Sequence, residues 1–162
     1  SGVAPIRALV DAGVRVGLAV DGSASNDSGH MLAEARQAML LARLRAGLMG
    51  ASLSSDGSEK LFTARQSLEL ATRGGAAVLG RKDIGSLEVG NCADFFAINL
   101  NRLEYAGALH DPVAAIVFCQ PGNVDLNVVH GKIVVKDQQL VNIDLPNLIS
   151  AHNKAASRLL SD

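Results

Sequence analysis

Large apolar residues alternate with small or polar residues over positions 14–21. The large residues that share one face are Val14, Val16, Leu18 and Val20. Bulky side chains on one face and small ones on the other are typical of a parallel barrel strand that helices cover. The pattern therefore predicts a strand over 14–21 that ends at Asp21, preceded by a short helix over 5–12 that Gly13 closes.

Residues from about Met31 to Leu44 repeat apolar positions with the period of a helix. The predicted buried stripe consists of Leu32, Ala35, Met39 and Ala42. The segment 22–29 before it is dense in residues that form turns and helix caps. We therefore expect a loop that leads into a long helix.

Thr63 and Gln66 have the spacing of a capping box, which predicts a helix that runs to about Thr72. In a capping box the two side chains satisfy backbone amides at the start of the helix. The glycine pair 74–75 is expected to interrupt this helix, before a further short helical stretch that Gly80 ends.

Beyond Gly80 the apolar pattern changes to that of strands. The predicted strands cover 93–100, 114–119 and 127–135. The last of them folds back at a two-residue turn made by His130 and Gly131. A capped amphipathic helix follows from Asp144.

These elements divide the chain into three parts. Residues 1–80 are expected to form the end of an α/β domain, 81–141 a small β unit and 142–162 a C-terminal helix. With 48% hydrophobic and 19% charged residues, the chain has the composition of a protein with a packed core.

Aromatic residues make up only 3% of the chain, and the net charge is -1 with both signs scattered along it. Neither a base-stacking platform nor a phosphate-binding stripe is therefore expected. No apolar run approaches the roughly 20 residues of a membrane span. We expect no nucleic-acid partner and no membrane partner.

Cys92 and Cys119 lie far apart, without the spacing of a metal site or a disulfide scaffold. They are predicted to be buried free thiols, which suits the reducing cytoplasm. The chain begins at Ser1 rather than at a methionine, and its 162 residues are too few for a complete barrel enzyme. We therefore expect it to be a piece of a longer protein.

Asp21 is a candidate functional residue because side chains from separate strands converge at the carboxyl ends of parallel strands. The alternative is a solvated loop carboxylate or a helix cap, and the pattern leaves both open. None of the four histidines has the HxH or HxxxH spacing of metal ligands. They are His30, His110, His130 and His152.

Several ordered motifs resemble the metal-dependent amidohydrolases that deaminate purines, pyrimidines and triazines. The motifs are 16–27, 30–32 and 34–36, similar to the eighth barrel strand with its loop and helix; 71–76, 79–80 and 84–95, similar to the exit into a β-sandwich domain; and 129–132, similar to the final hairpin. Within this superfamily, the branch that the chain resembles contains the 8-oxoguanine, guanine and triazine deaminases.

The resemblance implies an α/β and β fold class. We expect the C-terminal end of a TIM-like (β/α)8 barrel, incomplete in this chain, plus part of the small β-sandwich domain. It also implies one divalent metal ion, zinc or alternatively iron, held by histidines that this chain lacks and by the carboxylate at the position of Asp21.

The resemblance gives Asp21 two roles, as a metal ligand and as the group that accepts and returns a proton. Ser23, Ser25, Asn26 and His30 lie in the same loop. By the same resemblance they contact the substrate or hold the Asp21 carboxylate, whereas the pattern alone allows them to cap the next helix instead.

Two hypotheses follow. In the first, the intact protein is a metal-dependent aminohydrolase, of which this chain is the C-terminal part, and it releases ammonia from a purine-like or triazine amine, with 8-oxoguanine favoured. This chain alone would then be inactive, because a lone carboxylate cannot hold zinc. It would need its missing N-terminal part or another copy. In the second, the chain is a catalytically incomplete fragment that acts only as a structural or self-associating module.

Overall fold

A computed structural model describes residues 2–48, 61–119 and 122–161. The chain forms two compact units, Ser1–Cys92 with Leu100–Gly122, and Ala93–Asn99 with Asn123–Asp162. The predicted division of the chain into 1–80, 81–141 and 142–162 stays a prediction. Each unit is described by itself below.

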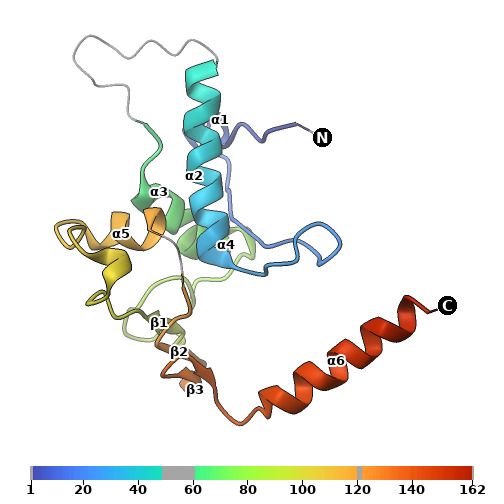
Figure 1. Cartoon of the computed structure of the whole chain (residues 1–162). Helices are drawn as coiled ribbons and strands as arrows, with labels where there is room; N and C mark the ends of the chain where they lie inside the picture. The colour runs from blue at the N-terminus through green and yellow to red at the C-terminus, as the bar shows by residue number, and fades with distance from the viewer. Residues whose placement is uncertain (1, 49–60, 120–121, 162) are drawn as a thin grey trace. The chain divides into compact units, whose positions relative to one another are not determined.

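The first unit is built around the long helix α2, Met31–Leu48 (Figure 1). Its buried residues are Leu32, Ala35, Ala38, Met39 and Ala42. This is the predicted apolar stripe with one added alanine, so the helical period placed the core correctly. The preceding helix α1, Ile6–Asp11, is followed by Gly13, which has a φ of 72°.

The predicted capping box is confirmed at the start of α3, Ala64–Glu69. The Thr63 hydroxyl accepts from Gln66 N–H at 3.1 Å, and the Gln66 side chain accepts from Thr63 N–H at 2.9 Å. The expected interruption at the glycine pair is wrong. The helix instead continues through a π-helical turn η1, Leu70–Gly74, into α4, Gly75–Val78.

Replacing Thr63 with alanine should lower the free energy of unfolding of the chain by about 1 kcal/mol, because the Gln66 amide at the helix start loses its acceptor. Urea denaturation measures the change. A matched control is Thr72→Ala, because the Thr72 hydroxyl donates to the Leu68 carbonyl of its own helix and caps nothing. Equal losses in the two variants would contradict the capping role.

The predicted strand 114–119 is wrong: these residues form the helix α5, Pro112–Phe118. The Asp111 side chain accepts from Ala114 N–H, and Pro112 occupies the first turn, where its missing N–H costs nothing. A short apolar run does not by itself distinguish a strand from a buried helix. The capping aspartate and the proline at the first turn favour a helix here over a strand.

Helices α2, α3 and α5 pack together, with Val117 of α5 fully buried beside Met39 and Phe62. Two arginines of α2 hold the end of α5. Arg36 donates to the Phe118 carbonyl at 3.3 Å, and the Arg43 guanidinium lies 5.0 Å from the centre of the Phe118 ring. Arg43 also donates to the Phe62 carbonyl at 2.8 Å.

The predicted strand over 14–21 is also wrong for this chain. In the part of the chain that the structure describes, this segment pairs with no other strand. Its Leu18 N–H instead donates to the Leu70 carbonyl of η1 at 3.4 Å. A strand is defined by backbone pairing with its neighbours, and this sequence supplies none for it.

The second unit contains a four-stranded antiparallel sheet in the order β1-β2-β3-β4. The strands are β1, Phe95–Ala97; β2, Leu126–Val129; β3, Lys132–Lys136; and β4, Gln139–Leu140. The predicted strands 93–100 and 127–135 are thus confirmed. His130 and Gly131 form the turn, with φ values of 48° and 74°. A two-residue hairpin turn of type I′ requires a positive φ at both of its central residues.

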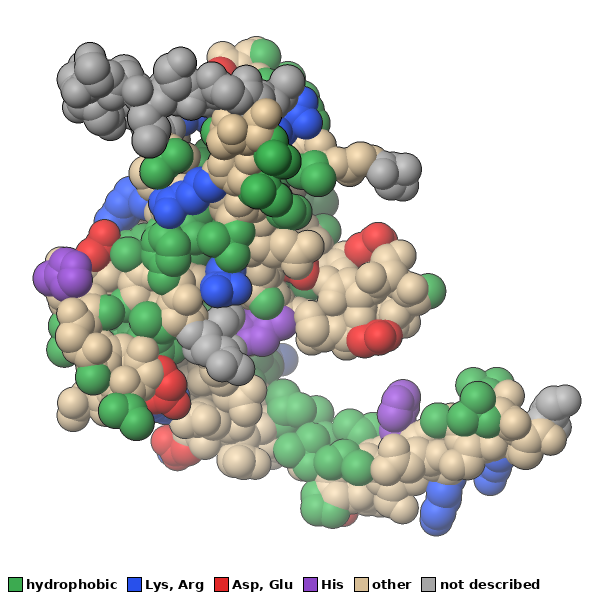
Figure 2. All heavy atoms as spheres, turned by 45° about the horizontal axis from the view of Figure 1, so that its top comes forward, with side chains coloured by type: hydrophobic (Ala, Val, Ile, Leu, Met, Phe, Trp, Pro, Cys, Tyr) green, Lys and Arg blue, Asp and Glu red, His purple; other side chains and the backbone are tan. Residues whose placement is uncertain are grey.

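The predicted C-terminal helix is confirmed as α6, Leu145–Leu159, with Asp144 accepting from Asn147 N–H at 3.1 Å. Its apolar side chains are exposed, including Leu148 at 53% and Ile149 at 56%. Figure 2 shows them gathered on one side of the helix and the basic side chains on the other. The described residues of the second unit therefore leave this apolar face exposed.

Cys92 and Cys119 are free thiols, as predicted, but each is half-buried rather than buried. The Cys92 thiol lies 3.4 Å from a carboxylate oxygen of Asp83, which Arg81 also contacts at 2.5 Å. The hydrogen bonds from Arg81, followed by the one from Cys92, lower the pKa of Asp83. Among the described residues, no helix is both long and apolar enough to cross a membrane.

Candidate active site

Asp21 lies where the extended segment 14–20 turns into the loop before α2. Its φ of 63° is in the left-handed region, where aspartate and asparagine are among the tolerated residues. Its Oδ1 atom accepts from Gly22 N–H at 2.8 Å. The side chain is exposed, so the carboxylate is available at the surface of the first unit.

The loop after Asp21 is folded back on itself and tied to α2. The Gly22 carbonyl accepts from the N–H groups of Ser25 and Asn26 at 2.8 and 3.0 Å. The Asn26 side chain then donates to Glu34 at 2.6 Å and accepts from Ser28 N–H at 3.1 Å. Asn26 therefore connects the loop that carries Asp21 to the first turn of α2.

A polar hollow of about 370 Å³ lies beside Asp21. It is lined by Ala19, Val20, Asp21, Ser25, Asn26, Ser28, Ala33, Glu34 and Gln37. The lining residues come from the end of the extended segment, from the loop after Asp21 and from α2. The arrangement offers carboxylate, amide and hydroxyl groups within one space.

The predicted loop residues divide into two groups. Ser25 and Asn26 line the hollow, whereas Ser23 and His30 do not. His30 lies at the start of α2, where its Nδ1 atom accepts from Ala33 N–H at 3.4 Å. The Asp21 carboxylate itself accepts from the backbone N–H of Gly22.

Glu34 and Gln37 were not predicted to take part in the site. They are three residues apart on α2, so one face of the helix presents both to the hollow. The signal in the sequence was a polar pair on the helix directly after the loop. This pair was not recognised as part of a site, because polar residues on a helix ordinarily face the solvent.

The donor set for a metal ion is incomplete in this chain. Among the residues that the structure describes, no three His, Cys, Asp or Glu side chains come together to hold one. A zinc site needs about three protein ligands plus water. The Asp21 carboxylate is suitable as one ligand, and the described residues around it do not complete such a set.

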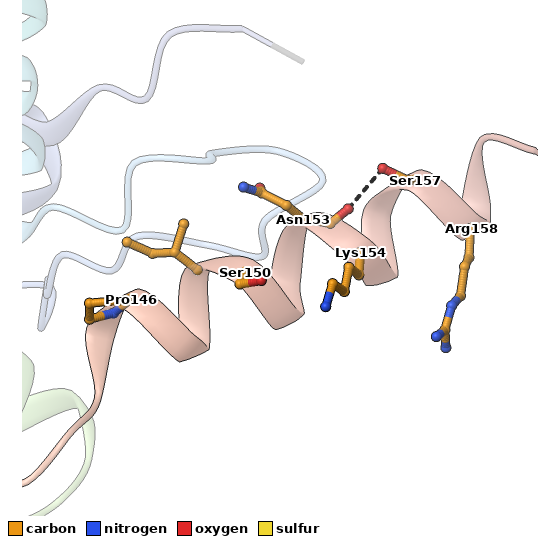
Figure 3. Close-up of a pocket in the computed structure, with 7 residues that line it drawn as sticks. Pro146, Ser150, Asn153, Lys154, Ser157 and Arg158 are labelled. Carbon is orange, nitrogen blue, oxygen red and sulfur yellow. Dashed lines mark hydrogen bonds between the residues drawn. The ribbon is translucent and has the colours of Figure 1, made fainter.

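A second hollow, of about 620 Å³, lies along α6 (Figure 3). Its lining residues are Pro146, Ile149, Ser150, Asn153, Lys154, Ser157 and Arg158. All of them belong to one helix, and Ser157 donates to the Asn153 carbonyl of that helix at 2.9 Å. The hollow is the open surface of an exposed helix, and it does not enclose a ligand.

Comparison with known proteins defines the class. Residues 1–134 match the Amidohydrolase family. The chain therefore belongs to the amidohydrolase family, as the resemblance of its motifs predicted.

Two curated relatives align with nearly the whole chain. It is 42% identical over 161 residues to an 8-oxoguanine deaminase of Pseudomonas aeruginosa, covering 99% of this chain and 33% of the relative. It is 40% identical over 161 residues to a hydroxydechloroatrazine ethylaminohydrolase of Pseudomonas sp. strain ADP, covering 98% and 31%. The chain thus spans about a third of the length of these relatives.

Solved structures share the fold. An atrazine chlorohydrolase of Arthrobacter aurescens complexed with zinc matches with a TM-score of 0.82 and 36% identity, covering 94% of this chain and 32% of that one. An adenosine deaminase of Xanthomonas campestris with bound zinc matches with a TM-score of 0.86 and 30% identity, covering 100% and 35%. The predicted fold class, an incomplete TIM-like amidohydrolase fold, is confirmed.

Proposed function

We propose that the intact protein is a metal-dependent aminohydrolase that removes an exocyclic amine from a purine-like or triazine heterocycle. Water replaces the amine, and ammonia leaves. The placement of Asp21 beside a polar hollow, in a chain of this family, carries the proposal. The 42% identity to an 8-oxoguanine deaminase favours 8-oxoguanine as the substrate.

In the proposed reaction, Asp21 handles the proton. Its Oδ1 atom is engaged by Gly22 N–H, which orients the carboxylate and leaves Oδ2 as the oxygen for proton transfer. Asp21 accepts a proton from the attacking water and passes it to the departing amine. One divalent metal ion, zinc or alternatively iron, would lower the pKa of that water when bound.

The remaining polar groups of the hollow are suited to hold a heterocycle. The Ser25 hydroxyl and the amides of Asn26 and Gln37 both donate and accept hydrogen bonds, as ring nitrogens and carbonyl oxygens require. We propose Ser25 and Asn26 as substrate contacts. Ser23 and His30 have a weaker claim, because they lie outside the hollow.

The partners in this proposal are a small heterocyclic amine and the rest of the protein, or a second copy, which completes the metal site. The proposed location is the cytoplasm, where free thiols such as Cys92 and Cys119 persist.

The test is ammonia release by the purified intact protein, loaded with zinc, from a panel of amines. The panel contains 8-oxoguanine, guanine, adenosine and an aminated hydroxytriazine. We expect kcat/KM for 8-oxoguanine to exceed the others by at least about tenfold, a difference of one or two well-placed hydrogen bonds. Turnover of only another member would correct the substrate, and no turnover of any would refute the proposal.

A non-catalytic role is the second candidate, and the exposed apolar face of α6 favours it. In this case the 162-residue chain is a self-associating module. Light scattering and metal analysis of the purified chain distinguish the two. A metal-free oligomer supports the module, whereas a monomer that gains zinc and turnover when the remainder of the protein is added refutes it.

A further inference from the structure

The π-helical turn η1 makes a close contact with the segment that leads to Asp21. A Cβ atom built on Gly74 would overlap the carbonyl oxygen of Val16. Gly74 has an ordinary helical conformation, with φ of -61° and ψ of -47°. The backbone therefore permits any residue at this position, and only the approach of Val16 requires glycine.

A hydrogen bond two residues further on strengthens this contact. Leu18 N–H donates to the Leu70 carbonyl, which also accepts from Gly75 N–H across the π turn. The extended segment is equally close to the helix at Gly17. A Cβ on Gly17 would lie 3.0 Å from Gly75 Cα and 3.3 Å from the Gly74 carbonyl carbon. Three consecutive residues of the segment, 16–18, thus rest directly on η1 and its end.

The opposite side of the same helix is also fixed. A Cβ on Gly85 would lie 3.0 Å from both the Thr72 carbonyl oxygen and the Ala76 side chain. The turn η1 is therefore held between the loop at Gly85 and the segment 16–18. A group added at Gly74 cannot be absorbed by moving the helix away, so the segment before Asp21 must move instead.

We propose that Gly74 is a positioning residue, which sets the place of the Asp21 carboxylate by letting the segment 16–18 rest on the π turn. This role rests on the proposed function of Asp21. Only two residues separate Leu18 from Asp21, so a shift of the segment is transmitted along the backbone to the carboxylate. Misplacement of a reacting group by about 1 Å lowers turnover by about 100-fold.

The adjacent glycine provides a matched control. A Cβ on Gly75 would meet nothing within 4 Å, although Gly75 lies in the same continuous helix. Gly74→Ala and Gly75→Ala therefore make the same chemical change at neighbouring positions. Only the first should disturb the segment before Asp21.

Amide hydrogen exchange on the 162-residue chain is the first measurement. In Gly74→Ala we expect the Leu18 amide to exchange at least about tenfold faster, with the amides of α2 unchanged. Gly75→Ala should leave both unchanged. A faster rate throughout the first unit would mean a general loss of stability and would overturn the proposal, as would equal effects of the two variants.

A second variant covers the case in which Gly74→Ala does not fold. Gly17→Ala adds a methyl group to the same contact on the side of the extended segment. Its Cβ would lie 3.0 Å from Gly75 Cα, which is a milder conflict than the overlap at Gly74. We expect a smaller acceleration of Leu18 exchange. Unchanged protection of Leu18 in that variant would overturn the proposal.

Turnover by the intact protein is the second measurement. In Gly74→Ala we expect kcat per folded molecule to fall about 10- to 100-fold, with Gly75→Ala close to wild type. A Gly74→Ala enzyme with full turnover would overturn the positioning role. If the wild type itself shows no turnover, the proposed function fails, while the exchange measurement still decides whether Gly74 holds the segment.

Discussion

Asp21→Asn in the intact protein should lower kcat for ammonia release by about 1,000-fold, within the 100- to 10,000-fold range of general acid–base groups. Asparagine preserves the shape of the side chain but cannot accept a proton. It also tolerates the left-handed backbone at this position, where φ is 63°. Its side-chain oxygen can still accept from Gly22 N–H, so the variant tests the chemistry without straining the loop.

The matched control is Asp27→Asn in the same loop. Asp27 is exposed and does not line the hollow, so this variant removes an equal charge without touching the proposed site. We expect its kcat to remain within about twofold of wild type, as for a surface substitution away from the site. Full turnover in Asp21→Asn would remove Asp21 from the mechanism. Equal losses in both variants would assign the effect to the charge of the loop.

The elements that the sequence predicted correctly are those with local signals. The stripe of α2 follows from the period of its apolar residues, and the start of α3 follows from Thr63 and Gln66, which are three residues apart. The hairpin at His130 and Gly131 is equally local. In each case the signal lies within the element itself, where a pattern in the sequence can reveal it.

The predictions that were wrong depend on distant residues or on competing local signals. The run 114–119 contains residues that favour strands, but Asp111 and Pro112 begin a helix before it. The segment 14–21 has the alternation of a strand, yet a strand forms only beside another strand, and none pairs with it in the described part of this chain. Neither outcome follows from periodicity alone.

The candidate site shows the same division. The position of Asp21 at the end of an apolar alternation was predictable from the sequence. The hydrogen bond from Asn26 to Glu34 and the approach of Gly74 to Val16 were not, because they join residues that are 8 and 58 positions apart. Such contacts depend on how the folded elements pack, and no pattern in a single sequence predicts them.

Met39→Ala in the 162-residue chain should lower the free energy of unfolding by about 2–5 kcal/mol. Met39 is fully buried in the cluster that joins α1, α2, α3 and α5, so truncation leaves a cavity that the rigid helices cannot close. With a urea dependence of about 2 kcal/mol per molar, the midpoint of denaturation should fall by about 1–2.5 M. Far-ultraviolet circular dichroism follows the transition.

Leu44→Ala is the matched control on the same helix. Leu44 is 55% exposed, so its truncation should change the free energy of unfolding by no more than about 0.5 kcal/mol. If both variants unfold at the wild-type midpoint, the core around Met39 is not assembled in the isolated chain. The helices would then acquire their packing only when the remaining two thirds of the relatives' length is present, and the chain could not act as an independent module.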